Sequence, residues 1–76
     1  MEEIIEILEK LKPGVDFEKE KHLIDDHIIE SMTMLRLVAA LNDEFDIEIT
    51  PKDLKPENFQ SVEAIHALVE NLLEDE

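Results

Sequence analysis

The sequence has no cysteine, a single glycine and no long apolar run, and each of these absences excludes a class of protein. Without cysteine the chain cannot be a disulfide scaffold, hold a thiolate zinc site or use a cysteine nucleophile. Gly14 alone cannot supply a dinucleotide-binding fingerprint or a phosphate-binding P-loop, which need several glycines. No apolar run approaches about 18 residues, so no membrane span is expected. The acidic start, residues 1–3, is unlike a secretory signal, and we therefore expect a cytoplasmic protein.

Basic side chains are also scarce. The chain carries 7 Lys and Arg against 21 Asp and Glu, which gives a net charge of −14. A polyanion of this size repels nucleic-acid backbones and anionic lipid surfaces, so neither is an expected partner. Proteins with basic surfaces are the natural partners, although the acidity could equally serve solubility alone.

We expect moderate salt or divalent cations to raise the melting temperature, because counter-ions screen the repulsion among the excess carboxylates. Thermal melts followed by circular dichroism at low and moderate ionic strength measure this effect. A melting temperature that does not change between the two conditions would count against it.

Length and hydrophobic spacing predict the architecture. The 76 residues have room for one domain, spanning 1–76, and we expect a monomer. Apolar residues recur at helical spacing, with a stop signal at Pro13-Gly14 and N-cap signals at Ser31, Thr50 and Ser61. Helices are expected over residues 2–12, over 31–44, from Pro51 to before Pro56, and from 62 to about 74.

The connection between the first two helices, residues 13–30, is unusually long for a compact domain. It contains irregularly spaced apolar residues that would anchor it across the helices, and long anchored loops are more often functional than short ones. No segment predicts a strand with a partner. The expected fold is all-α: a small, mostly antiparallel four-helix bundle with three main helices, a short third helix and this long loop.

The two serines, Ser31 and Ser61, both lie where a helix is expected to start, and helix capping is the simplest role for each. A helical wheel separates them. The helix after Ser61 has one apolar face, made of Val62, Ile65, Leu68, Val69, Leu72 and Leu73.

The helix that starts at Ser31 has two apolar stripes. Its core stripe contains Met34, Leu37, Val38, Leu41 and Phe45. A second stripe, Met32, Leu35 and Ala39, lies well away from the core stripe. We expect it to be partly exposed and to form a docking surface beside Ser31. The alternative is that the long loop covers it with Phe17 or Ile28.

The residues predict neither catalysis nor a metal site. Ser31 has no signalled base or oxyanion-forming glycine turn, so it is not expected to be a catalytic nucleophile. His22, Asp25, Asp26 and His27 form a loose group that is more typical of a solvated loop than of metal ligands. The stretch 43–46 lacks the glycine of an EF-hand, and His66 is expected to lie on an exposed helix face.

Two stretches, DHIIESM at 26–32 and LVAALNDEFDIEI at 37–49, are similar to the acyl carrier protein family. The resemblance covers essentially the whole chain. It implies that Ser31 carries a 4′-phosphopantetheine arm, placed from coenzyme A by a phosphopantetheinyl transferase. The thiol of that arm would hold an acyl or aminoacyl group as a thioester, and the chain itself would be a carrier and not an enzyme.

The resemblance also implies a partner surface, made of Glu30, Met32, Leu35, Arg36 and Ala39. It would be read by the transferase, by an acyl- or aminoacyl-loading ligase and by acyl-using enzymes. This sequence departs from the family pattern at Ile28, where glycine is usual, at Glu30, where aspartate is usual, and at Met32, where leucine is usual. Arg36 stands where fatty-acid carriers commonly have glutamate, and Ser31-Met32 followed by threonine resembles D-alanyl and some peptidyl carriers.

Arg36 and the Ser31-Met32 pair favour a specialised acyl or aminoacyl carrier over the carrier of fatty acid biosynthesis. The alternative function is an acidic helical adaptor that has no prosthetic group and acts through the same surface.

Overall fold

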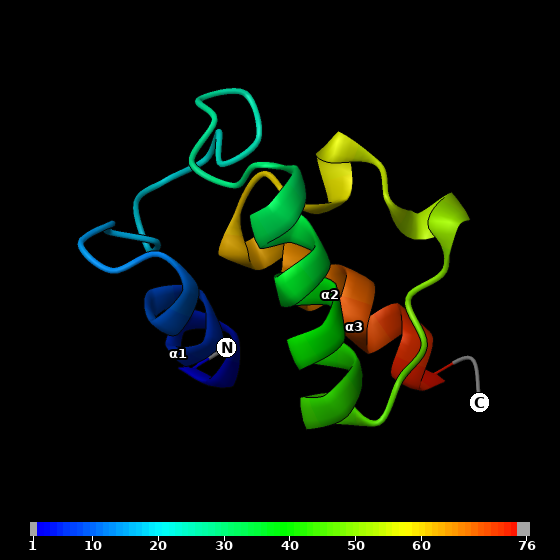
Figure 1. The fold of residues 1–76 in the computed structure, drawn as a ribbon. Helices are drawn as coiled ribbons and strands as arrows, with labels where there is room; N and C mark the ends of the chain where they lie inside the picture. The colour runs from blue at the N-terminus through cyan, green and yellow to red at the C-terminus, as the bar shows by residue number, and fades with distance from the viewer. Residues whose placement is uncertain (1, 75–76) are drawn as a thin grey trace.

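The computed structural model describes residues 2–74, which form three α-helices and two single 3₁₀ turns (Figure 1). Met1, Asp75 and Glu76, which belong to the single domain predicted over 1–76, lie outside the described residues. The elements are α1 (Glu2–Leu11), α2 (Ser31–Phe45), η1 (Pro51–Asp53), η2 (Pro56–Asn58) and α3 (Val62–Glu74). The described residues contain no strand, so the predicted all-α class is confirmed.

The predicted short third helix exists only as the turns η1 and η2, so the four-helix bundle is not confirmed. Pro56 explains the interruption, because a residue before proline is driven out of the helical region. Lys55 accordingly has extended backbone angles, φ −97° and ψ 139°. The start of η1 was predicted correctly: the Thr50 N–H and hydroxyl both donate to Asp53 Oδ2, at 3.1 and 3.0 Å.

Both α1 and α2 are followed by a residue with a left-handed backbone conformation. Gly14 takes φ 89° shortly after α1, where glycine carries no steric cost. Asp46 is the C-cap of α2 and has φ 54°. Its N–H donates a hydrogen bond to the carbonyl oxygen of Asn42. Asn42 also accepts a 2.9 Å bond from the Ile49 N–H through its side-chain oxygen, which directs the chain away from the helix.

The hydrophobic core draws on the helices and on the long loop alike. Its buried side chains are Ile4, Leu8, Phe17, Leu23, Ile29, Leu37, Leu41, Ile49, Phe59, Val62, Ile65, Leu68 and Val69. Three of them come from the 13–30 loop, which is therefore anchored as predicted. Figure 1 shows this loop gathering at the end of the molecule where α2 begins.

The apolar face predicted for α3 is confirmed except at Leu73. The first five positions are buried or packed on the core, but Leu73 is 44 % exposed. Leu73 lies at the edge of the apolar arc, in the last turn of α3, so it turns away from the other helices. None of the helices described over 2–74 has the length and apolar character needed to cross a membrane.

Candidate functional site

The two serines occupy different positions at their helices. Ser61 precedes α3, and its Oγ accepts a 3.1 Å hydrogen bond from the Ala64 N–H, so its predicted capping role is confirmed. Ser31 is instead the first residue of α2, and Glu30 holds the N-cap position. The carbonyl oxygen of Glu30 accepts the Met34 N–H at 2.7 Å, so Glu30 caps a helix that begins at Ser31, as predicted.

The prediction that Ser31 caps α2 is therefore wrong. Its side chain is exposed and makes no hydrogen bond to any other residue within 2–74. A hydroxyl at the first helical position points away from the amides that a cap residue would reach. Ser31 is left as an accessible hydroxyl at the positive end of a 15-residue helix.

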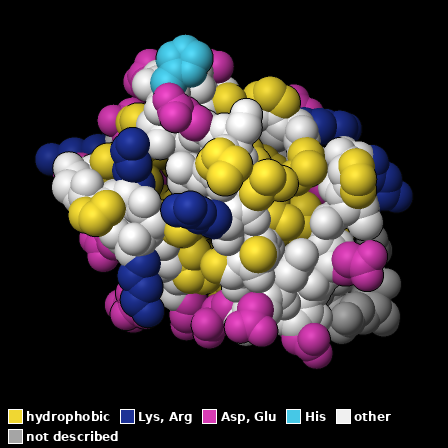
Figure 2. Space-filling model, in the orientation of Figure 1, with side chains coloured by type: hydrophobic (Ala, Val, Ile, Leu, Met, Phe, Trp, Pro, Cys, Tyr) yellow, Lys and Arg dark blue, Asp and Glu magenta, His cyan; other side chains and the backbone are white. Residues whose placement is uncertain are grey.

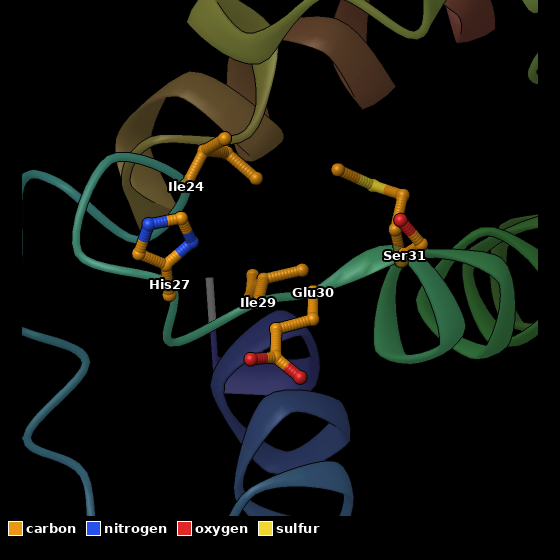
Figure 3. Close-up of a pocket in the computed structure, with 6 residues that line it drawn as sticks. Ile24, His27, Ile29, Glu30 and Ser31 are labelled. Atoms are coloured by element: carbon orange, nitrogen blue, oxygen red, sulfur yellow. The ribbon is translucent and has the colours of Figure 1, made fainter.

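An open pocket of about 330 Å³ adjoins this hydroxyl. It is lined by Ile24, His27, Ile29, Glu30, Ser31 and Met34. Figure 3 shows Ile24 and the His27 ring side by side on one side of the hollow and Ser31 on the other. The Glu30 carboxylate points away from the space between them. The lining is therefore mainly apolar, with an imidazole on the wall opposite Ser31.

Gln60 fixes the loop wall of this pocket. Its side-chain oxygen accepts hydrogen bonds from the backbone N–H of Ile24, at 3.0 Å, and of Asp25, at 3.3 Å. Its backbone oxygen accepts the Leu23 N–H at 2.9 Å. Gln60 was not predicted as a functional residue. It is an isolated glutamine between the core residue Phe59 and the cap residue Ser61, and its hydrogen-bond partners cannot be predicted from these neighbours.

Replacing Gln60 by alanine is expected to lower the free energy of unfolding by about 1–2 kcal/mol, because the part-buried Ile24 N–H loses its acceptor. Gln60→Glu, which keeps an acceptor oxygen at this position, should recover most of the loss. Urea denaturation gives the stabilities, and amide hydrogen exchange at Ile24 reports the local opening. Equal stability of the alanine and glutamate variants would show that the acceptor is unimportant.

A second contact ties the loop to α3. The Lys21 ammonium donates a hydrogen bond to the carboxylate of Glu63, in the first turn of α3, and this lowers the pKa of Glu63. Because the folded-state pKa is lowered, the contribution to stability is present at neutral pH and is lost on acidification. Both side chains are about half exposed, so the solvent screens this ion pair.

The turn before Ser31 bends at His27 and not at Ile28. Ile28, which stands where the resemblance has glycine, is half-buried and packs against the core. The left-handed residue is its neighbour His27, with φ 59°. A left-handed conformation is unfavourable for most residues other than glycine, so the neighbouring contacts must hold it. The Ile29 N–H, which bonds to the Leu23 oxygen at 2.9 Å, closes this turn.

The second stripe of α2 is exposed, as predicted. Met32 is 66 % and Leu35 62 % exposed, and Ala39 is exposed as well; these three residues form the α2 strip. The loop does not cover them, because Phe17 is buried in the core and Ile28 packs against it. Figure 2 shows hydrophobic side chains gathered over α2 and the η1–η2 segment, with acidic side chains along the lower edge.

Arg36 and Leu54 add to this face. Arg36 is exposed and forms no ion pair within the described part of the chain. Leu54, between η1 and η2, is 40 % exposed and was not anticipated from the sequence. The face beside Ser31 thus combines apolar side chains with the Arg36 guanidinium, which has no ion pair among the described residues, on a protein of net charge −14.

Two of the three histidines each contact one nearby carboxylate. His22 Nδ1 lies 3.7 Å from Asp25 Oδ2, and His66 Nε2 lies 3.1 Å from Glu70 Oε1. His66 is partly buried, whereas an exposed position was predicted. No group of three or more potential metal ligands was found among residues 2–74.

The chain was compared with known proteins. Residues 2–69 match the family model described as "Phosphopantetheine attachment site". Aminoacyl carrier protein 1 of Bradyrhizobium diazoefficiens is 36% identical over 63 residues, which cover 83% of this chain and 69% of that protein. No solved structure gives a significant match. The chain therefore belongs to the acyl carrier protein family, and 4′-phosphopantetheine is its covalent prosthetic group.

Proposed function

We propose that Ser31 is the residue to which 4′-phosphopantetheine is attached. The observation that carries this proposal is the contrast between the serines: the Ser31 hydroxyl is exposed and has no hydrogen bond among residues 2–74, whereas Ser61 Oγ is engaged as a cap. These two are the serines of the chain. An exposed hydroxyl beside an open pocket suits the prosthetic group, which needs a free oxygen and room for a long substituent.

The start of α2 favours the phosphodiester that such an attachment creates. Ser31 is at the first helical position, where backbone N–H groups have no partner within the helix. These N–H groups and the helix dipole stabilise an anion. The first turn of α2 contains no acidic residue, so no carboxylate within it competes for these donors.

The chain is proposed to act as a non-catalytic carrier of one domain in the cytoplasm. The thiol supplied by the prosthetic group would hold an acyl or aminoacyl group as a thioester. Carrier proteins of this family work with a phosphopantetheinyl transferase and with other partner enzymes. We propose that these enzymes contact Glu30, Arg36 and the α2 strip, while the acidic surroundings attract their basic patches.

The cargo is proposed to be an aminoacyl or other specialised acyl group. The similarity to a protein named as an aminoacyl carrier supports this, and so does Arg36, which stands where fatty-acid carriers commonly have glutamate. Charging assays with amino-acid-adenylating ligases and with fatty-acid synthase enzymes separate the two cargo classes. Efficient turnover by the synthase enzymes, with no charging by the ligases, would refute the aminoacyl assignment.

The attachment is tested by incubating the chain with coenzyme A, magnesium and a broad-specificity phosphopantetheinyl transferase. Intact-mass measurement should show the gain of one phosphopantetheine, and peptide mapping should place it on Ser31. A chain that gains nothing would act only as the acidic helical adaptor, and a gain at another residue would refute the assignment to Ser31.

A further inference from the structure

The pocket beside Ser31 has a defined wall as well as room for a substituent. Ile24, His27 and Ile29, from the loop that precedes Ser31, line its far wall. Met34, one turn further along α2, lines the near side. The wall is held in place from outside by Gln60 and by the closed turn at His27. The fold therefore keeps the pocket open, although a loop that packed closely against α2 would bury more apolar surface.

We infer that this pocket receives the pantoyl segment of the prosthetic arm, so that the arm lies along the protein before it reaches solvent. The inference rests on the proposed attachment at Ser31. Because Ser31 is itself part of the lining, the segment that can enter is the one next to the phosphodiester, and not the thiol end. That segment carries two methyl groups on one carbon, followed by a hydroxyl and an amide.

The lining matches the chemistry of this segment. Ile24, Ile29 and Met34 offer an apolar surface for the two methyl groups. The His27 imidazole, which has both a donor and an acceptor nitrogen when neutral, can bond the hydroxyl or the amide. The Glu30 carboxylate is directed away from the hollow and so does not repel the phosphodiester there (Figure 3).

The size of the pocket also limits what it can hold. Its volume of about 330 Å³ is at the lower end of the roughly 300–1,000 Å³ that small-molecule sites occupy. It has room for one segment of the arm and not for the arm together with a long acyl chain. Cargo would therefore remain outside this pocket, where partner enzymes can reach it.

A second pocket supplies an internal control. It has a volume of about 290 Å³ and is lined by Ile7, Lys10, Leu11, Ala40, Asp43 and Glu44. It is similar in size and partly apolar, but Asp43 lies twelve residues beyond Ser31, or about 18 Å along the axis of α2. The pantoyl segment cannot reach it.

The experiment is NMR of isotope-labelled protein before and after loading with unlabelled coenzyme A and the transferase. We expect nuclear Overhauser cross-peaks from the pantoyl methyl groups to the methyl groups of Ile24, Ile29 and Met34. Chemical shifts should change at these residues and at His27, and they should stay unchanged at Ile7 and Leu11. Loading is confirmed by intact mass before each spectrum.

Two filling variants sharpen the test. Ile24→Phe should occupy the hollow and remove the cross-peaks, whereas Ile7→Phe, in the second pocket, should retain them. If the loaded native chain shows no cross-peaks and shift changes only at 30–32, the arm lies in solvent and this inference is overturned while the attachment stands. If no phosphopantetheine is gained at Ser31, both proposals are refuted together.

Discussion

Replacing Ser31 by alanine is expected to abolish phosphopantetheine transfer completely, whereas replacing Ser61 by alanine should leave transfer intact. Both variants remove one hydroxyl from the start of a helix, so they are closely matched chemically. They differ in what the hydroxyl does in the folded chain: Ser61 Oγ accepts the Ala64 N–H, and Ser31 Oγ has no such bond among the described residues. Intact mass after incubation with coenzyme A and the transferase gives the outcome.

The stabilities of the same two variants should change in the opposite sense. Ser61→Ala loses an N-cap and should cost about 1 kcal/mol in the free energy of unfolding. Ser31→Ala loses no hydrogen bond and gains helix propensity, so its stability should be unchanged or higher by about 0.5 kcal/mol. A Ser31→Ala variant that still gains phosphopantetheine, or that is as destabilised as Ser61→Ala, would show that the roles of the serines have been misassigned.

The helices could be predicted from the sequence because the spacing of apolar residues indicates which side chains of a helix are buried. The two stripes of α2 are an example: Leu37 and Leu41 are fully buried, and Leu35, in the α2 strip, is exposed as its angular position requires. The same reasoning predicted that the long loop is anchored, because large apolar side chains such as Phe17 and Leu23 are buried in the core and not exposed to solvent.

Features that depend on single backbone angles could not be predicted in this way. The N-cap of α2 lies at Glu30 and not at Ser31, because a cap is defined by φ and ψ and serine is acceptable at either position. The left-handed residue is His27, although glycine would be the natural choice there and histidine gives no signal of it. Gln60 bonds to a loop 35 and 36 residues away, a separation that no local pattern encodes.

Replacing Leu35 by aspartate should leave the helical bundle folded and lower kcat/KM for phosphopantetheine transfer about 10- to 100-fold, equivalent to about 1.4–2.7 kcal/mol. Leu35 lies one helical turn beyond Ser31 and is 62 % exposed. An enzyme that works at Ser31 must cover this position, and an aspartate there would be desolvated without a partner. Because the side chain contributes little to the core, the melting temperature should change only slightly.

Leu37→Asp supplies the opposite control on the same helix. Leu37 is fully buried, so a carboxylate there costs more than about 4 kcal/mol, which removes most or all of the roughly 3–5 kcal/mol that a core of this size provides. Circular dichroism should therefore show Leu37→Asp unfolded and Leu35→Asp folded. If Leu35→Asp unfolds instead, Leu35 belongs to the core and the α2 strip is not a docking face.

The added negative charge needs a control of its own, because it changes the attraction of any basic enzyme. Asn71→Asp adds the same charge at an exposed position on α3. If the transferase uses the α2 strip, Asn71→Asp should change kcat/KM less than about twofold, since one more negative charge far from the strip changes little in the field of a chain whose net charge is −14. Equal losses in Leu35→Asp and Asn71→Asp would mean that the enzyme senses only the overall acidity, and that the exposed leucine is not part of the surface it contacts.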